Sequence, residues 1–418
     1  MSDLYASGQI RTQYLDPVSF VPNGRCAFEL DADKVAYLSN MRLLNLGCVT
    51  DATPGEYSRG LGSLACIKNI RLMDARTELG ALRNPAQYLF WKNVNRTNSE
   101  NKSNDSYLKR NGIGQEISAI TNKVHRIYAS NVVTNDPDTT NLGYLDLREV
   151  FPILNEVAVL PVAVFSNLRI EIEFEGNTNR QILTDTARPV TIQRPVLALD
   201  HTDDPETVKQ AMAAIAQGVS WREIENDNFT MPAVDLGANP NRRQASQFQS
   251  MAFRGKYLER MLLCKQLQTL ADEQTGTTVL GYGGVASSQA VLQQHTQYRL
   301  NGKNILPGFN GTTGANEALG LLSDEWGVSS MLPGGNLYQW SNIGLVTEGA
   351  SDNSGQTAWD CIRVGARVSE LQVQVSRLNN QDTSTTKTPT NSALTINLFA
   401  EVQKQLTVMG NDYIVGYM

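Results

Sequence analysis

The stretch NLRIEIEFEGNTNRQILTDTARPVTIQRPVLAL, which runs from Asn167 to Leu199, decides the fold of this chain. It opens with strict alternation, in which the apolar Leu168, Ile170, Ile172 and Phe174 are separated by charged residues. Alternation with a period of two predicts an antiparallel strand that packs one face on a core and turns the other to solvent. A polar segment follows, and apolar residues return in VTIQRPVLAL, which predicts a second strand region.

The same arrangement recurs 203 residues further along the chain (168 to 371). The segment ELQVQVSRLNNQDTSTTKTPTNSALTINLFAEV, from Glu370 to Val402, again places two alternating runs around a polar region. The two runs begin 22 residues apart in the first segment (168 to 190) and 23 apart in the second (371 to 394). Matched order and matched spacing indicate an internal duplication and not a short-period solenoid.

Two looser echoes support the duplication. SNMRLLNLGCV (Ser39–Val49) is similar to YLERMLLCKQL (Tyr257–Leu267), and IKNIRLM (Ile67–Met73) is similar to TQYRLNG (Thr296–Gly302). The offsets between the copies differ, as loops of unequal length would cause. A chain of 418 residues is also long enough for two domains with separate cores.

We therefore predict an all-β chain of two tandem eight-stranded jelly-roll β-sandwiches, with a few short helices in the connections. The N-terminal jelly roll would span residues 1–203 and the C-terminal one residues 221–418, with a helical linker over residues 204–220. In this linker Asp204 suits the N-cap, Pro205 the first helical position and Gly218 the end. These residues predict a helix over 205–217.

Further strands are predicted wherever apolar and polar residues alternate. In the first half these are CAFEL, LACIKNIRLM and KVHRIYASNVV, and in the second half KYLERMLLCKQL, QYRLNGKNIL, CIRVGARV and LTINLFAEVQKQLTV. A second helix is predicted over Ala75–Val94, because Leu79, Leu82, Tyr88 and Leu89 form a helically spaced stripe.

The composition of the chain argues against several classes of protein. The net charge of −6 argues against a protein that wraps nucleic acid, which requires a basic face. The five cysteines have no C-x-x-C pair and are interpreted as buried, reduced thiols. We see no signal peptide at the N-terminus and no apolar run near the length of about 18 residues that a membrane span needs.

Motifs for chemistry are absent from the sequence, which contains no phosphate-binding loop, nucleophile elbow or H-E-x-x-H pattern. Glu171 and Glu173 are interpreted as a solvated strand face and not as an acid–base pair. The oxygen-rich DPDTTNLGYLD (Asp136–Asp146) suits a turn-rich connection, with a calcium site as the alternative. We predict no enzyme, and no catalytic, cofactor-binding or metal-binding residues.

One segment suggests a family. In GYLDLREVFPILNEVAVLPVAVFSNLRIEIEFE the pairs Phe151-Pro152 and Leu160-Pro161 precede the alternating strand Leu168–Phe174. This order resembles the first domain of the double jelly-roll major capsid proteins of double-stranded DNA viruses, which include large DNA viruses, virophages and polinton-like viruses. The N-terminal CAFELDADKVAYLSNMRLLNL and the C-terminal LTINLFAEVQKQLTVMGNDYIVGYM are similar to the family's opening and closing strands.

The resemblance implies a structural protein of the virion. Three chains would form a homotrimeric, pseudo-hexameric capsomer, and capsomers would tile an icosahedral shell assembled inside the host cell. Its partners would be neighbouring capsomers, penton and minor capsid proteins and, in some viruses, an inner membrane, without sequence-specific nucleic acid binding. The alternatives are a vertex, spike or receptor-binding capsid protein, or a two-domain carbohydrate-binding β-sandwich protein.

Five N-x-S/T sequences favour exposed loops, whether or not they are glycosylated. They begin at Asn95, Asn101, Asn104, Asn228 and Asn310.

Overall fold

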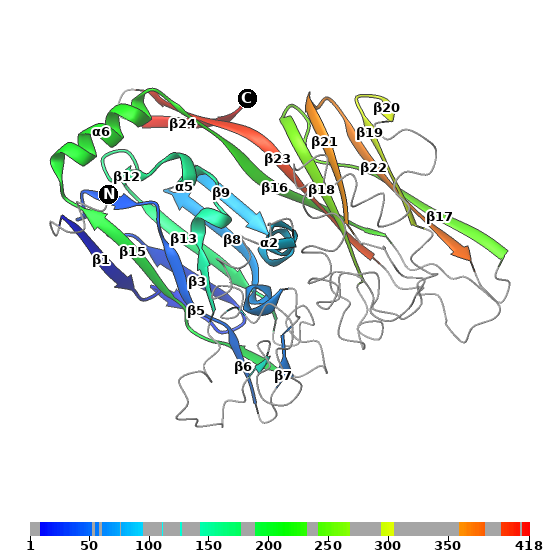
Figure 1. The fold of residues 1–418 in the computed structure, drawn as a ribbon, viewed down its shortest axis with the longest axis horizontal. Coiled ribbons are helices and arrows are strands. Elements are labelled where there is room, and N and C mark those ends of the chain that lie inside the picture. The colour runs from blue at the N-terminus through cyan, green and yellow to red at the C-terminus, as the bar shows by residue number, and fades with distance from the viewer. Residues whose placement is uncertain are drawn as a thin grey trace.

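The computed structural model describes most of the strands predicted above. The described residues are 9–51, 55–57, 61–75, 77–94, 111, 126–127, 143–176, 189–231, 241–267, 294–304, 359–380, 394–409 and 412–418. Within them the chain forms two β-sandwiches that stand side by side (Figure 1).

The first sandwich consists of two facing antiparallel sheets. The first sheet contains β1 (Ile10–Leu15), β15 (Val196–Thr202), β5 (Arg42–Leu46) and β11 (Gly143–Asp146). In the same sheet β4 (Ala36–Leu38) pairs with the C-terminal end of β15, and β12 (Val159–Pro161) pairs with β4. The second sheet contains β2 (Ser19–Phe20), β3 (Arg25–Glu29), β13 (Leu168–Phe174), β8 (Ile67–Asp74) and β9 (Thr77–Arg83), in that order. Two small two-stranded sheets lie nearby: β6 (Cys48–Thr50) with β14 (Val190–Ile192), and β7 (Gly55–Glu56) with β10 (Arg126–Ile127).

The second sandwich has the same construction. One sheet has the order β16 (Val219–Met231), β23 (Leu394–Met409), β18 (Tyr257–Leu267) and β21 (Trp359–Arg367), and β24 (Asp412–Tyr417) pairs with the end of β23. The other has the order β17 (Asn241–Ser250), β22 (Leu371–Asn380), β19 (Gln294–Leu300) and β20 (Lys303–Asn304).

Both sandwiches share one topology. Eight strands in each can be numbered in chain order: β1, β3, β5, β8, β9, β11, β13 and β15 in the first, and β16 to β23 in the second. In both, the sheets then have the orders 1-8-3-6 and 2-7-4-5. This is the jelly-roll arrangement, in which two interleaved Greek keys build two packed sheets. The predicted fold class is therefore confirmed.

The four sequence echoes fall on equivalent strands. The segments Asn167–Leu199 and Glu370–Val402 contain the seventh strands, β13 and β22, and reach into the eighth strands, β15 and β23. The looser echoes match the third strands, β5 and β18, and the fourth, β8 and β19. The seventh and eighth strands do not pair with each other, because they lie in opposite sheets. VTIQRPVLAL also divides into two strands, β14 and β15, which belong to different sheets.

The alternation of β13 fills the core as predicted. Leu168, Ile170, Ile172 and Phe174 are all buried, while the charged residues between them are partly exposed. β13 is a central strand, paired with β3 on one side and β8 on the other. Its apolar side chains therefore face the opposite sheet over the whole length of the strand.

The linker helix is confirmed, and the other predicted helix is half wrong. α6 (Pro205–Ala216) begins where the Asp204 carboxylate accepts a hydrogen bond from the Thr207 backbone N–H at 2.8 Å. The Ala75–Val94 segment instead forms β9 and then α2 (Pro85–Val94). A register shift between β8 and β9 adds a residue near Leu79, so Leu79 and Leu82 are both buried although they lie in a strand. Because of this bulge, two buried leucines lie three residues apart in a strand, a spacing that is otherwise typical of a helix.

Smaller departures occur at other positions. In LACIKNIRLM the strand begins at Ile67, after a 3-10 helix, η1 (Gly62–Cys66). Asn228 lies within β16 and not in a loop, and the other four N-x-S/T sites lie outside the described residues. Cys26, Cys48 and Cys66 are buried and free, as predicted. No helix in the described part of the chain combines the length and hydropathy of a membrane span.

Candidate functional site

Among the described residues, no group of three or more His, Cys, Asp or Glu side chains is arranged to hold a metal ion. Glu171 and Glu173 lie in ion pairs on the outer face of the first sandwich, with Arg71 and Lys68 respectively. Of the calcium candidate Asp136–Asp146, residues 136–142 lie outside the described residues. Asp146 accepts hydrogen bonds from its near neighbour Arg148.

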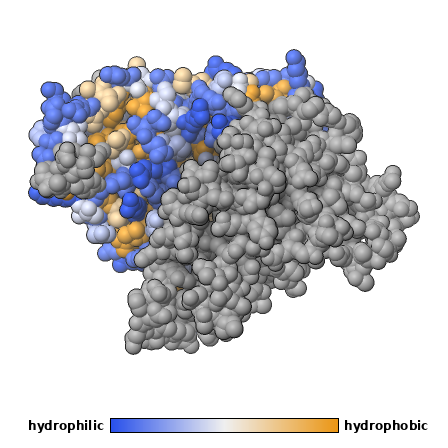
Figure 2. Space-filling model, viewed as in Figure 1, coloured by the Kyte–Doolittle hydropathy of each residue, from blue (hydrophilic) through white to orange (hydrophobic). Residues whose placement is uncertain are grey.

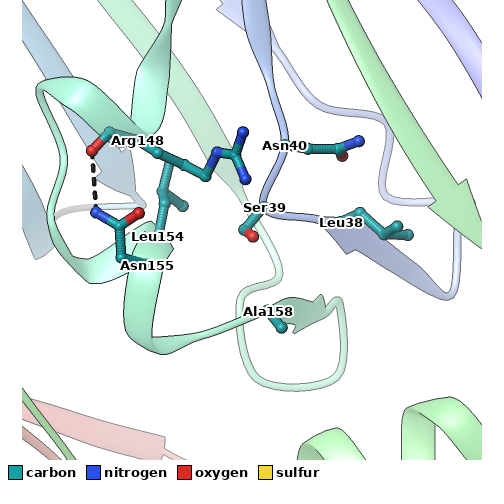
Figure 3. A pocket seen from close by; sticks show the side chains of 7 residues that line it. All are labelled: Leu38, Ser39, Asn40, Arg148, Leu154, Asn155 and Ala158. Atoms are coloured by element: carbon teal, nitrogen blue, oxygen red, sulfur yellow. Dashed lines mark hydrogen bonds between the residues drawn. The ribbon is translucent and has the colours of Figure 1, made fainter. Parts of the chain in front are cut away.

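A pocket of about 340 Å³ lies at one end of the first sandwich, beneath the connection that follows β4 (Figure 3). It is bounded on one side by Ser39 and Asn40, and on the other by Arg148 and Asn155. The guanidinium of Arg148 binds both carboxylate oxygens of Asp146, at 3.0 and 2.6 Å. Asp146 neutralises the charge of Arg148. The described residues of this pocket therefore offer no free charged group to hold a ligand.

A more distinctive feature is the contact between the two sandwiches, called the junction below. It is formed by β9, α2 and α5 (Ile153–Glu156) of the first sandwich together with β16, β23 and β24 of the second. In Figure 1, β16, β23 and β24 extend from the second sandwich over the first, and α2 lies between the two sandwiches. The buried cores of the two sandwiches are continuous through it.

Buried polar groups pair across the junction. Asn397 of β23 donates to Gln87 of α2 at 3.0 Å, and the Tyr413 hydroxyl of β24 donates to Asp74 of β8 at 2.7 Å. The Tyr413 ring also packs on Phe165, with ring centroids 5.4 Å apart. Paired buried polar groups fix one relative arrangement of the surfaces that carry them, since a shift would leave each group unsatisfied.

Two glutamates of β16 lie beside this contact in opposite electrostatic states. Burial raises the pKa of Glu223 to about 7, against the lowering effects of Lys404 and the Trp221 indole. Burial would also raise the pKa of Glu225, but hydrogen bonds from Lys256 and Tyr417 and the charge of Lys404 hold it below its ordinary value. β16 thus carries two carboxyl groups of opposite behaviour: Glu223 resists ionisation and Glu225 favours it.

Several large apolar side chains of the described residues are exposed. Figure 2 shows hydrophobic groups interspersed with hydrophilic ones over the described face of the first sandwich. In the first sandwich Tyr14, Val18 and Val21 lie along the segment from β1 to the β2–β3 turn, and in the second Phe248 lies on β17.

Comparison with known proteins identifies the architecture. Neither a protein-family model nor a curated protein matches this sequence. Solved structures do match. PBCV-1 VP54, fitted into a reconstruction of the virophage Sputnik, matches with a TM-score of 0.53 and 10% identity, over 98% of this chain and 97% of its own. The major capsid protein of mavirus matches at 0.52 and 9%, over 97% and 90%, and that of Faustovirus at 0.52 and 9%, over 96% and 90%.

The chain has the double jelly-roll fold of viral major capsid proteins. Within this fold, Phe151-Pro152 lies directly before α5, with Pro152 at its N-cap, and Leu160-Pro161 lies in β12, both between β11 and β13. Phe151 and Leu160 are buried, and α5 contacts β16 of the other jelly roll. The segment that carries the resemblance therefore contributes to the junction of the double jelly roll.

Sequence reasoning missed the junction residues. Glu223 and Glu225 alternate with other residues in VSWREIENDNFTM just as Glu171 and Glu173 do in β13, yet their surroundings are opposite. A signal exists in Trp221, which shares a strand face with both glutamates. A large aromatic residue on that face indicates that it is covered by protein.

Proposed function

We propose that this chain is a structural major capsid protein that forms a homotrimeric, pseudo-hexameric capsomer of an icosahedral virus shell. The observation that carries the proposal is the repeated topology, which places two equivalent jelly rolls in one chain. Three such chains present six similar sandwiches around a threefold axis and so approximate a hexagon. The fold shared with viral major capsid proteins supports the same role.

The trimer interface would be heterologous, because a threefold ring joins different surfaces of adjacent copies. We assign the apolar edge near Tyr14, Val18 and Val21 to one side of this interface and the edge strand β17, with Phe248, to the other. Burial of these exposed side chains against a neighbouring copy would contribute about 25 cal/mol for each Å² of apolar surface removed from water. Obligate interfaces commonly bury roughly 2,000 Å² or more.

The remaining parts of the proposal follow from this role. The protein would be non-enzymatic, would act in the virion, and would contact penton and minor capsid proteins as well as neighbouring capsomers. Its net charge of −6 favours a shell that leaves genome condensation to another protein. We propose the domain limits 1–203 and 221–418 with the connector 204–220, supported by the position of α6 between β15 and β16.

Mass measurement tests the proposal. Light scattering or native mass spectrometry should give a species near three times 46.0 kDa, and negative-stain images should show six-sided particles. The double variant Val21→Asp, Phe248→Asp should dissociate this species, whereas Ala213→Asp on the exposed face of α6 should leave it intact. A wild-type chain that remains monomeric at micromolar concentration would contradict the capsomer.

A further inference from the structure

A buried carboxyl group lies at the centre of the junction. Glu223 of β16 is fully buried, and its side chain lies against the backbone of β9 in the other sandwich. A Cβ atom at Gly80 of β9 would lie 3.2 Å from Glu223 Oε1 and 2.9 Å from the Phe151 ring. The absence of a side chain at Gly80 is therefore what allows the carboxyl group to reach this position.

This carboxyl group is only partly satisfied. Its Oε2 atom accepts a hydrogen bond from the Trp221 indole N–H at 2.6 Å, within the same strand. Its Oε1 atom has no hydrogen-bond partner among the described residues. A buried carboxylate with one unpartnered oxygen is costly, whereas the protonated group carries no charge and is tolerated more easily.

The charges around Glu223 do not neutralise it. Glu78 of β9 and Glu225 of β16 raise its pKa, and Lys404 of β23 lowers it. However, the Lys404 ammonium forms an ion pair with Glu225 at 3.4 Å, and so it is shared with a second carboxylate. The charge of Glu223 also acts on the hydroxyl of Tyr88 in α2. The other charges that act on this hydroxyl are those of Glu401 on β23, Glu149 on η3 (Leu147–Glu149) and Arg260 on β18.

From this geometry we propose that the junction is controlled by a proton: it is tightest when Glu223 is protonated, and it loosens when that carboxyl group ionises. As far as Glu223 is concerned, the two jelly rolls would then be held more firmly in acidic than in neutral or alkaline solution. Ionisation places a buried charge beside Gly80, offset only by the Lys404 ammonium that Glu225 shares, and separation of β9 from β16 would admit water to solvate it. The inference concerns contacts within one chain and does not depend on the proposed capsid role.

The direction and size of the effect follow from linkage. Because the pKa of Glu223 rises from 4.5 to about 7 in the folded chain, the closed junction binds the proton more tightly than the open one. Closure is therefore most favourable below pH 4.5, weakens as the pH rises from 4.5 to 7, and is weakest above 7. The shift corresponds to a change of roughly 300-fold, at most, in the equilibrium constant for closing.

Hydrogen–deuterium exchange of the full-length protein tests the proposal at pH 5 and pH 8.5. Wild type is compared with Glu223→Gln, which keeps an acceptor for Trp221 but cannot ionise, and with the matched control Glu29→Gln, an exposed strand residue. Comparison at the same pH removes the pH dependence of intrinsic exchange. We expect peptides from β9 and β16 to exchange at least tenfold faster in wild type than in Glu223→Gln at pH 8.5, and at most about fourfold faster at pH 5.

The central strand β13 provides the internal reference, because β8 separates it from β9 within their sheet. Equal exchange of wild type and Glu223→Gln at both pH values would overturn the proposal, as would an equal effect of Glu29→Gln. If Glu223→Gln does not fold, the proposal is tested by the exchange of the wild-type protein alone. After correction for intrinsic rates, its protection in β9 relative to β13 must fall at least tenfold between pH 5 and pH 8.5, and a constant ratio would contradict the proposal.

Discussion

Replacement of Tyr413 by phenylalanine isolates one hydrogen bond that holds the C-terminal strand β24 to the first jelly roll. The Tyr413 hydroxyl donates to Asp74 Oδ2 at 2.7 Å, and Asp74 Oδ1 accepts from the Asn167 backbone N–H at 2.8 Å. Burial and the neighbouring Asp74 raise the pKa of Tyr413, so its hydroxyl stays protonated and donates throughout the working pH range. The ring contact with Phe165 is retained in the variant.

The expected loss of stability depends on the hydrogen bonds that Asp74 keeps in the variant. Asp74 is 6% exposed, so it keeps one donor and loses the other without gaining full access to water. A hydrogen bond to a charged group contributes about 1.5–3 kcal/mol, and we expect Tyr413→Phe to lower the free energy of unfolding by that amount. Tyr413→Ala also removes the ring, and its cost should reach about 3–5 kcal/mol, as large-to-small changes at buried aromatic residues do.

Urea unfolding at pH 7 measures these losses. Glu29→Gln serves as the control, because Glu29 is an exposed strand residue and its replacement should change stability by less than about 0.5 kcal/mol. If Tyr413→Phe unfolds at the same urea concentration as Glu29→Gln, the hydroxyl does not stabilise the attachment of β24 and the reasoning fails.

Three further predictions concern the junction and the core. Gly80→Ala should destabilise the protein by about 1–3 kcal/mol in thermal or urea unfolding, because the added methyl group would overlap the Phe151 ring; an unchanged midpoint would show that β9 can move away freely. Ile170→Ala, in the centre of β13, should cost about 2–5 kcal/mol, and a loss below 1 kcal/mol would mean that the site is less well packed than its burial indicates. Glu225→Gln should cost about 1.5–3 kcal/mol at pH 7. The pKa of Glu225 is lowered in the folded protein, so its stabilising contribution is present above pH 4.5 and is lost as the pH falls through the pKa of the folded state. The difference in stability between wild type and Glu225→Gln should therefore disappear in acid. A difference that persists in acid would contradict the ionised, hydrogen-bonded state of Glu225.

The two glutamates of β16 together predict where stability is greatest. Glu225 favours the folded state once it is ionised, whereas Glu223 opposes folding increasingly from pH 4.5 to about 7. Mildly acidic solution satisfies both groups best, because Glu225 is charged there and Glu223 is still largely protonated. An environment that changes pH across this interval would alter the junction without any change in the jelly rolls themselves.

The sequence by itself determined the strands, the duplication and the linker helix. Alternation over Leu168–Phe174 has a local cause, since successive side chains point to opposite faces of a strand, and Asp204 caps its helix through a residue three positions away. Local rules failed near Leu79, where a bulge against β8 placed two residues three apart on the same buried face.

Only the tertiary structure decided which sheet each strand joins and which acidic residues are buried. The seventh and eighth strands share a sequence segment but lie in opposite sheets, because their partners come from distant parts of the chain. Glu171 forms ion pairs at the surface and Glu223 is buried against Gly80, although both alternate in similar strands. The state of a carboxyl group depends on the solvent and charges around it, and for Glu223 those surroundings include Gly80 and Lys404, which are each more than a hundred positions away in the sequence.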